Sequence, residues 1–165
     1  MSVRHAVVTG GSSGIGLETA RGLLRRGFER VAIIGRDDAR LARAVKSLGP
    51  GAVPLRADFG SLAEVRACAE EVRATLHPLT VLVNNAGVWH SERTLSQDGF
   101  EDTFAVNHLA HFEFTRCLLD HLAEAGAGKP VEFGEGDARK PLAAELRTLL
   151  TNLPAPVEFG EFATA

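Results

Sequence analysis

Residues 5–16 read HAVVTGGSSGIG, and they join two local patterns. His5–Gly10 is a short apolar run typical of a strand, and Ile15–Arg26 carries apolar residues at the spacing of one helical face. A strand that passes through a glycine-rich turn into a helix is the arrangement that binds the phosphates of a dinucleotide. Residues 5–16 therefore predict a dinucleotide-binding fold.

The glycines of this turn each have a mechanical role. Gly10 would end the strand in a tight turn, Gly14 would let the backbone approach a pyrophosphate, and Gly16 would let the helix pack close to the sheet. A phosphate would then meet the free N–H groups and the positive dipole end of the helix. Ser12 and Ser13 add hydroxyl donors at the same place.

Strand-like and helix-like segments alternate along the first 125 residues. Gly27 stands where a helix often ends, Asp37 or Asp38 can cap the next helix, and Ser61 with Glu64 forms a capping box. This alternation predicts an α/β fold, a shortened Rossmann-like, doubly wound parallel sheet with an atypical C-terminal segment. Strands are expected at residues 5–10, 30–35, 52–58 and 80–84, and helices at 15–26, 37–48, 61–76 and 99–124.

The second and third expected strands end on polar residues. Arg36 could pair with the 2′-phosphate of NADP, which favours NADP over NAD, or it could lie solvated at a loop edge. Asp58 could accept a hydrogen bond from an adenine amine, or it could serve the turn before Gly60. Both positions lie at the carboxyl edge of the sheet, where such folds bind ligands.

The character of the chain changes after residue 125. We expect residues 1–125 to form the dinucleotide-binding core and residues 126–165 to form an extension of the same domain. PVEFGE occurs at residues 130–135 and again at 156–161, with a helix-like segment between them. A strand–helix–strand unit and a chance or recent duplication explain this repeat equally well.

Composition excludes several classes of protein. A net charge of −3 over 165 residues offers no broad basic surface for nucleic acid. Cys68 and Cys117 have no metal-ligand spacing, so we expect two reduced thiols and no metal site. No apolar run reaches membrane-spanning length, and we expect a cytoplasmic protein that acts on a small molecule and forms homo-oligomers through exposed edges.

Several motifs in order resemble the short-chain dehydrogenase/reductase family. They are TGGSSGIG, NNAG at residues 84–87 and the later Asn107, and the likeness covers residues 4–125, with residues 84–119 most similar to the retinol dehydrogenase branch. The resemblance implies a Rossmann fold with NADP or NAD in its crevice. It also implies that the cofactor is lined by Gly10, Ser12, Gly14, Ile15, Gly16, Arg36, Asp58, Phe59, Asn85, Ala86 and Gly87.

The catalytic residues that the resemblance implies are mostly missing. Asn107 matches an asparagine that holds a water in the proton relay of that family. The serine, tyrosine and lysine that complete the relay have no match, because the chain has no tyrosine and no serine beyond Ser96. Lys129 and Lys140 lie in segments that match no family motif.

Other histidines offer weaker candidates for proton transfer. His90 follows the NNAG turn at the expected mouth of the site, as a catalytic group or as an exposed loop residue without an orienting partner. His108 and His111 share a helix face, where packing explains them better than a metal does. Three functions stay open: an NADP(H)-binding oxidoreductase of altered or impaired catalysis, a non-catalytic NADP(H)-binding partner or sensor, and a redox-neutral isomerase, cyclase or dehydratase.

Overall fold

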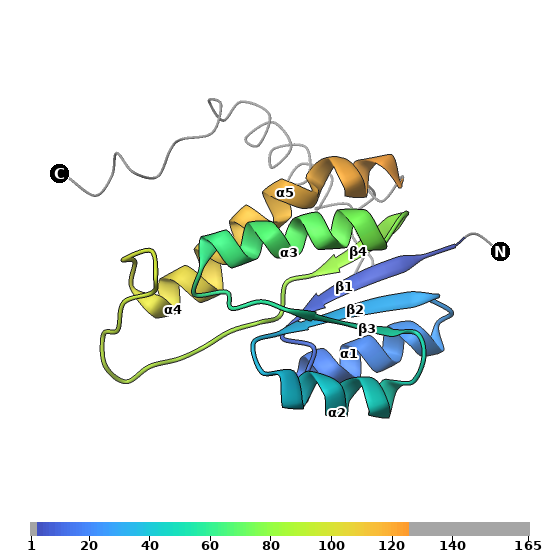
Figure 1. The fold of residues 1–165 in the computed structure, drawn as a ribbon, viewed down its shortest axis with the longest axis horizontal. Coiled ribbons are helices and arrows are strands. Elements are labelled where there is room, and N and C mark those ends of the chain that lie inside the picture. The colour runs from blue at the N-terminus through green and yellow to red at the C-terminus, as the bar shows by residue number, and fades with distance from the viewer. Residues whose placement is uncertain (1–2, 126–165) are drawn as a thin grey trace, which may run out of the picture. The chain divides into compact units, whose positions relative to one another are not determined.

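A computed structural model describes residues 3–125, and the expected repeat unit at 130–161 lies outside these residues. Within the described part, four strands alternate with helices (Figure 1). The strands are β1 (His5–Thr9), β2 (Arg30–Gly35), β3 (Ala52–Arg56) and β4 (Leu79–Val83). The helices are α1 (Gly14–Arg25), α2 (Asp38–Leu48), α3 (Leu62–Thr75), α4 (Asp102–Phe104), the π-helical turn η1 (Ala105–Leu109) and α5 (Ala110–Glu124).

The four strands form one parallel sheet in the order β3-β2-β1-β4. The chain steps outward from β1 to β3 and then crosses back to place β4 on the other side of β1. This reversal is the switch point at which doubly wound folds bind ligands, beyond the carboxyl ends of the strands. The predicted α/β, Rossmann-like sheet is confirmed; β2 has the expected boundaries, and those of the other strands differ by at most two residues.

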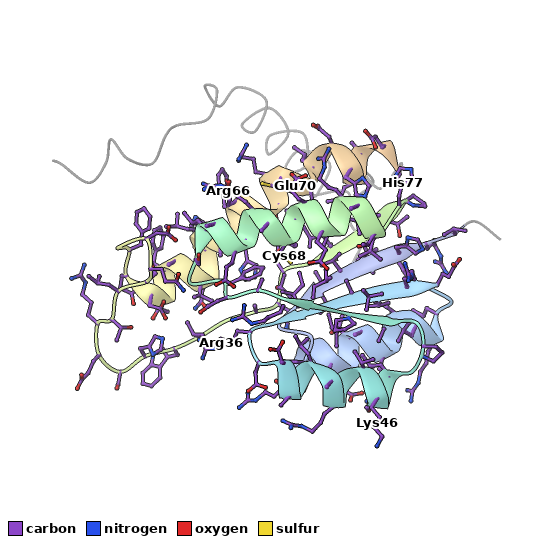
Figure 2. All side chains as sticks on the ribbon, viewed as in Figure 1. Arg36, Lys46, Arg66, Cys68, Glu70 and His77 are labelled. Carbon is purple, nitrogen blue, oxygen red and sulfur yellow. The ribbon has the colours of Figure 1, made fainter. Side chains whose placement is uncertain are left out.

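Helices cover both faces of the sheet, α1 and α2 on one face and α3 and α5 on the other (Figure 1). Side chains alternate along each strand, so Ala6 and Val8 of β1 join the cluster beneath α1 and α2, while Val7 joins the cluster beneath α3 and α5. The central strands β1 and β2 are buried on both faces, which explains why β2 is a nearly continuous apolar run. Cys68 is buried on α3, where burial raises the pKa of its thiol to about 12 (Figure 2).

The predicted helix caps are confirmed in part. Asp37 accepts a hydrogen bond from the Arg40 N–H, and Ser61 accepts one from the Glu64 N–H. The reciprocal half of the capping box is wrong, because the Glu64 carboxylate accepts from the Asp58 N–H at 3.0 Å instead. Glu64 thereby holds the turn between β3 and α3, directly beside the ligand-binding edge.

The helix expected at residues 99–124 begins later and is not uniform. The side chain of Glu101 caps it by accepting from the N–H groups of Thr103 and Phe104. A single wide turn, η1, then precedes α5 and carries Asn107. Such π-turns inside helices occur often at functional sites. No helix within residues 3–125 combines the length and apolar character needed to cross a membrane.

Candidate dinucleotide-binding site

A cavity of about 350 Å³ lies at the carboxyl edge of the sheet. It is lined by the glycine-rich turn, the ends of β2 and β3, and the segment after β4. Of the residues predicted to bind a cofactor, those that line it are Gly10, Ser12, Ser13, Ile15, Gly16, Arg36, Asp58, Phe59, Asn85, Ala86 and Gly87. Gly14 lines an adjoining hollow that shares Ser12 and Ser13 with the cavity.

The geometry of the turn bears out the reasons given for two of its glycines. Gly10 has a φ of +66°, in the left-handed region that favours glycine. A Cβ on Gly16 would overlap the carbonyl oxygen of Gly10 and lie 2.5 Å from Nδ2 of Asn85. A side chain at Gly16 would therefore push α1 away from the sheet edge and from the segment after β4.

The start of α1 has the features that a phosphate group requires. Ser13 is the N-cap residue, yet its side chain makes no capping hydrogen bond, and the first turn holds no acidic residue. A Cβ built on Gly14 meets no atom within 4 Å, so the backbone there is open to a close approach. The first-turn N–H groups and the Ser13 hydroxyl remain available to an anion at the positive end of the helix dipole.

Two arginines line the cavity beside the end of β2. Arg36 follows the last residue of this strand and is exposed (Figure 2). Arg40, in the first turn of α2, also lines the cavity and was not predicted, although its spacing of four residues from Arg36 was visible in the sequence. Asp37 lies between them, but the N–H of Arg40 occupies its carboxylate at 2.8 Å and lowers the pKa of Asp37.

Thr9 fixes the segment that follows β4. Its hydroxyl oxygen accepts hydrogen bonds from the backbone N–H groups of Asn85 and Ala86, at 2.8 and 2.9 Å. In return, the side-chain amide of Asn85 donates to the Thr9 carbonyl at 2.9 Å. The NNAG segment is therefore hydrogen-bonded to the end of β1, which places Ala86 and Gly87 along the cavity.

Asn107 holds the next residue of the same segment. Its Oδ1 accepts from the Val88 N–H at 2.8 Å, and its Nδ2 donates to the Val88 carbonyl at 2.9 Å. Both ends of the amide are thus used to position the backbone at Val88. The water-holding role that the resemblance implies for Asn107 stays a prediction, and this side chain acts as a positioning group.

His111 connects Thr9 to Asn107. Because the Thr9 hydroxyl already accepts two N–H groups, its proton can go to Nε2 of His111 at 3.0 Å. Nδ1 of His111 then carries the ring proton and donates to the Asn107 carbonyl at 3.3 Å. Burial is the main cause that lowers the pKa of His111, which agrees with this neutral form. The prediction that His111 serves packing did not include these two hydrogen bonds.

His90 lies outside the cavity lining. Its Nε2 contacts a carboxylate oxygen of Asp102 at 2.8 Å, and Asp102 itself lies beside Gly60, at the end of the β3–α3 turn. The sequence alone indicates no orienting partner for His90, because Asp102 is twelve residues away along the chain. The role of His90 in proton transfer stays a prediction.

Acid–base groups are scarce along the described cavity lining. Among the residues of the part 3–125 that line it, Asp58 is the sole carboxylate, and tyrosine, lysine, histidine and cysteine do not occur. Asp58 uses one oxygen to accept from the Gly60 N–H at 2.9 Å. Phe59 is 6% exposed, with its ring packed against His111 and Phe114. The lining therefore suits binding and orientation of a dinucleotide, and residues 3–125 bring no proton donor of the tyrosine–lysine kind to it.

Comparison with known proteins agrees with this geometry. Polyprenol dehydrogenase from Homo sapiens is 38% identical over 129 residues, covering 75% of this chain and 39% of the relative. Retinol dehydrogenase 14 from Mus musculus is 38% identical over 146 residues, covering 79% and 43%. The chain thus spans about two fifths of the length of these curated relatives.

A solved structure extends the likeness to the fold. A metagenomic short-chain oxidoreductase in complex with NADP superposes with a TM-score of 0.66 at 30% identity, covering 92% of this chain and 75% of the other. The family model described as short chain dehydrogenase matches residues 4–144. Sequence, sheet order and the glycine-rich turn agree, and the chain belongs to the short-chain dehydrogenase family.

Proposed function

We propose that this chain binds NADP(H) in the cavity at the carboxyl edge of its sheet, as the nucleotide-binding part of a short-chain oxidoreductase. The observation that carries the proposal is the convergence of eleven predicted residues from four separate segments on one cavity. The fit is chemical as well as spatial, because open N–H groups at the start of α1 suit a pyrophosphate. When bound, the dinucleotide would supply the hydride chemistry, and the protein supplies position and orientation.

The pair of arginines supports NADP(H) over NAD(H). An acidic side chain at the end of β2 would accept from a ribose 2′-hydroxyl, whereas this chain has Arg36 there. Arg40 adds a second guanidinium at the same wall of the cavity. Asp37, the nearest acid, has its carboxylate turned to the start of α2. Two guanidinium groups favour a 2′-phosphate, and they offer no acceptor to a 2′-hydroxyl.

Catalysis by these 165 residues alone is expected to be impaired. Reduction of a carbonyl needs a proton as well as a hydride, and a tyrosine beside a lysine supplies that proton in the relay that the resemblance implies. The 165 residues contain no tyrosine. The described lining offers Asp58 as its one carboxylate, on the β3 side of the cavity and tied to the turn at Gly60.

A dinucleotide titration tests the proposal directly. Trp89 is the single tryptophan, is 80% exposed, and directly follows the cavity residue Val88. Energy transfer from its indole to the reduced nicotinamide would report binding of NADPH and NADH on the same scale. We expect NADPH to bind at least tenfold more tightly than NADH, about the effect of one charge-assisted hydrogen bond.

Two variants and an activity measurement complete the test. Arg36→Ala should lower the NADPH affinity toward that of NADH and leave the NADH affinity constant, while Lys46→Ala, at the other end of α2, should leave both unchanged (Figure 2). Absence of binding for both dinucleotides would overturn the proposal. If the chain consumed NADPH with a panel of carbonyl compounds at the rates of a working dehydrogenase, the expectation of impaired catalysis would be wrong. The proposed binding site would be unaffected by that result.

A further inference from the structure

Two histidines and a glutamate meet at the opposite edge of the molecule from the dinucleotide cavity. His77 follows the C-terminal end of α3, whereas His121 and Glu124 lie in the last turn of α5. One nitrogen of each ring and one carboxylate oxygen of Glu124 all lie within 4.8 Å of one another. The expectation of no metal site rests on the cysteine spacing and does not consider this cluster. His77 and His121 stand 44 positions apart in the chain, and the packing of α3 against α5 brings them together.

A hydrogen bond fixes the ring tautomer of His121. Its Nε2 lies 2.8 Å from the backbone carbonyl oxygen of Leu76, which can only accept, so Nε2 must carry a proton and donate. In the neutral ring, Nδ1 then presents a lone pair. That nitrogen faces Glu124, whose Oε2 is 3.9 Å away. Metal-binding histidines commonly donate their other ring N–H to a backbone carbonyl in this way, which fixes the tautomer and the ring orientation.

The other two groups are free to close around an ion. His77 and Glu124 are exposed, and the His77 and His121 rings are tilted by 37° with their centroids 5.2 Å apart. Zinc binds histidine nitrogen and carboxylate oxygen at about 2.0–2.2 Å, so the three ligand atoms must approach one another by about 1 Å. Side-chain rotation of an exposed histidine and a glutamate in a terminal helical turn can supply that movement.

The polar character of this edge extends into the protein. His5, at the start of β1, is 6% exposed, and neither of its ring nitrogens has a hydrogen-bond partner within the described residues. It lies on the face of the sheet that packs against α3 and α5, because it alternates with Val7 and Thr9 along the strand.

We infer that His77, His121 and Glu124 form a binding site for a divalent transition-metal ion such as Zn²⁺, with water completing the coordination. Imidazole and carboxylate groups are suitable ligands for this class of ion, and the hydrogen bond from His121 to the Leu76 carbonyl fixes the orientation of one ligand in advance. The ion would tie the end of α5 to the turn between α3 and β4. Its role is structural, because the strands separate it from the dinucleotide cavity, and the inference stands independently of the proposed function.

Metal titration of the full chain, purified without a histidine tag and stripped with a chelator, tests the inference. We expect Zn²⁺ to bind with one ion per chain by calorimetry, and Co²⁺ to give the absorption bands of nitrogen and oxygen coordination. Zn²⁺ should also raise the melting temperature, since it binds the folded chain, and a chelator should reverse the rise. Lack of binding at micromolar Zn²⁺, or a stoichiometry of one ion per two chains, would overturn the site.

The variants avoid the buried ring of His121, whose loss would leave the Leu76 carbonyl unpaired. His77→Ala and Glu124→Gln change exposed groups and should each weaken Zn²⁺ binding at least tenfold. The matched controls are His108→Ala, an exposed histidine on η1, and Asp120→Asn, an exposed acid one turn earlier on α5. Zn²⁺ affinities that fall equally in the controls and in the site variants would contradict the assignment.

Discussion

Oγ1 of Thr9 and Nε2 of His111 lie 3.0 Å apart, and this buried contact joins the end of β1 to α5 beside the dinucleotide cavity. The same hydroxyl holds the N–H groups of Asn85 and Ala86. One side chain from the strand thus sets the position of the NNAG segment, while the histidine orients that hydroxyl. The geometry of the cavity therefore depends on residues that do not line it.

Replacing Thr9 by valine removes the hydrogen bonds of the hydroxyl group and keeps the volume of the side chain. Thr9→Val leaves two partly buried backbone N–H groups without their acceptor, which should lower the free energy of unfolding by about 1 kcal/mol or more. NADPH affinity should fall as well, because Ala86 and Gly87 lose their fixed position. Urea unfolding and the Trp89 titration measure the two effects.

Thr80→Val is the matched control for this change. Thr80 also bonds to a backbone group, the His5 carbonyl at 2.9 Å, but at the edge of the sheet away from the cavity. It should lower stability without changing NADPH affinity. An equal loss of affinity in both variants would mean that overall stability, and not the NNAG segment, controls binding.

His111 should make stability depend on pH near neutrality. Burial lowers the pKa of His111 in the folded chain, with the nearby His108 acting in the same direction. In the unfolded chain the ring takes up a proton near pH 6.5, before the folded ring does. The free energy of unfolding should therefore fall as the pH drops below about 6.5, until the folded ring is protonated too.

Denaturant unfolding between pH 8 and pH 5 checks this sign. His111→Gln removes the titrating ring and should flatten the part of the slope that His111 contributes. His5, whose pKa burial also lowers, should retain its share in that variant. A slope that is unchanged by His111→Gln would contradict the neutral, hydrogen-bonded ring.

Gly16 and Gly22, two of the three glycines of α1, should respond in opposite ways to alanine. Gly16→Ala places a Cβ against the Gly10 carbonyl and Nδ2 of Asn85, so both stability and NADPH affinity should fall. Gly22 lies in the same helix, and a Cβ there meets no atom within 4 Å. Gly22→Ala should raise the free energy of unfolding by roughly 0.5–1 kcal/mol, since alanine has the higher helix propensity. A stabilising effect of Gly16→Ala would refute the close packing of α1.

Much of this fold was predictable because its signals are local. The turn at residues 9–16 marks the end of a strand and the start of a helix within one short segment, and β2 is nearly all apolar because both of its faces are covered. The cap residues Asp37 and Ser61 marked helix starts correctly. Such features depend on neighbours within four residues, which a sequence displays directly.

Most of the missed features depend on contacts between distant segments, whereas Arg40 lies only four residues from the predicted Arg36. His90 contacts Asp102, twelve residues away, only because the segment after β4 folds back. The bond between Thr9 and His111 spans 102 positions along the chain. No local sequence pattern encodes these pairs, so the residues could be identified from the sequence but their contacts could not.

Arg40 should contribute to the choice between dinucleotides. Arg40→Ala removes one of the two guanidinium groups at the cavity wall, so the NADPH affinity should fall by roughly tenfold while the NADH affinity stays constant. Arg40→Lys should restore part of the affinity, because an ammonium group keeps the positive charge but cannot donate the two parallel hydrogen bonds of a guanidinium group. A parallel loss for NADH would show that Arg40 supports the start of α2 instead, through its 3.9 Å contact with Asp37.

The buried carboxylate of Glu113 should govern the acid stability of the α3–α5 layer. Its side chain is 2% exposed and receives charged hydrogen bonds from Arg66 at 2.6 Å and from Arg116 at 2.8 Å. Arg116 is the main partner, and together these bonds lower the pKa of Glu113 to about 2. Stability from this site is present above the ordinary glutamate pKa and is lost as the pH falls toward about 2.

The contrast between Glu113→Gln and Arg66→Met/Arg116→Met tests this arrangement. Glu113→Gln should cost up to about 3 kcal/mol at pH 7 and remove the steep loss of stability in acid, because the arginines, each about half exposed, can return to water. The double arginine variant should be worse at pH 7, since it leaves a buried carboxylate without a partner. Glu70→Gln, which neutralises an exposed carboxylate one turn after Arg66 on α3 (Figure 2), should change both quantities far less. If the double variant proved more stable than Glu113→Gln at pH 7, the carboxylate would have to be hydrated, and the two arginines would not hold it in place.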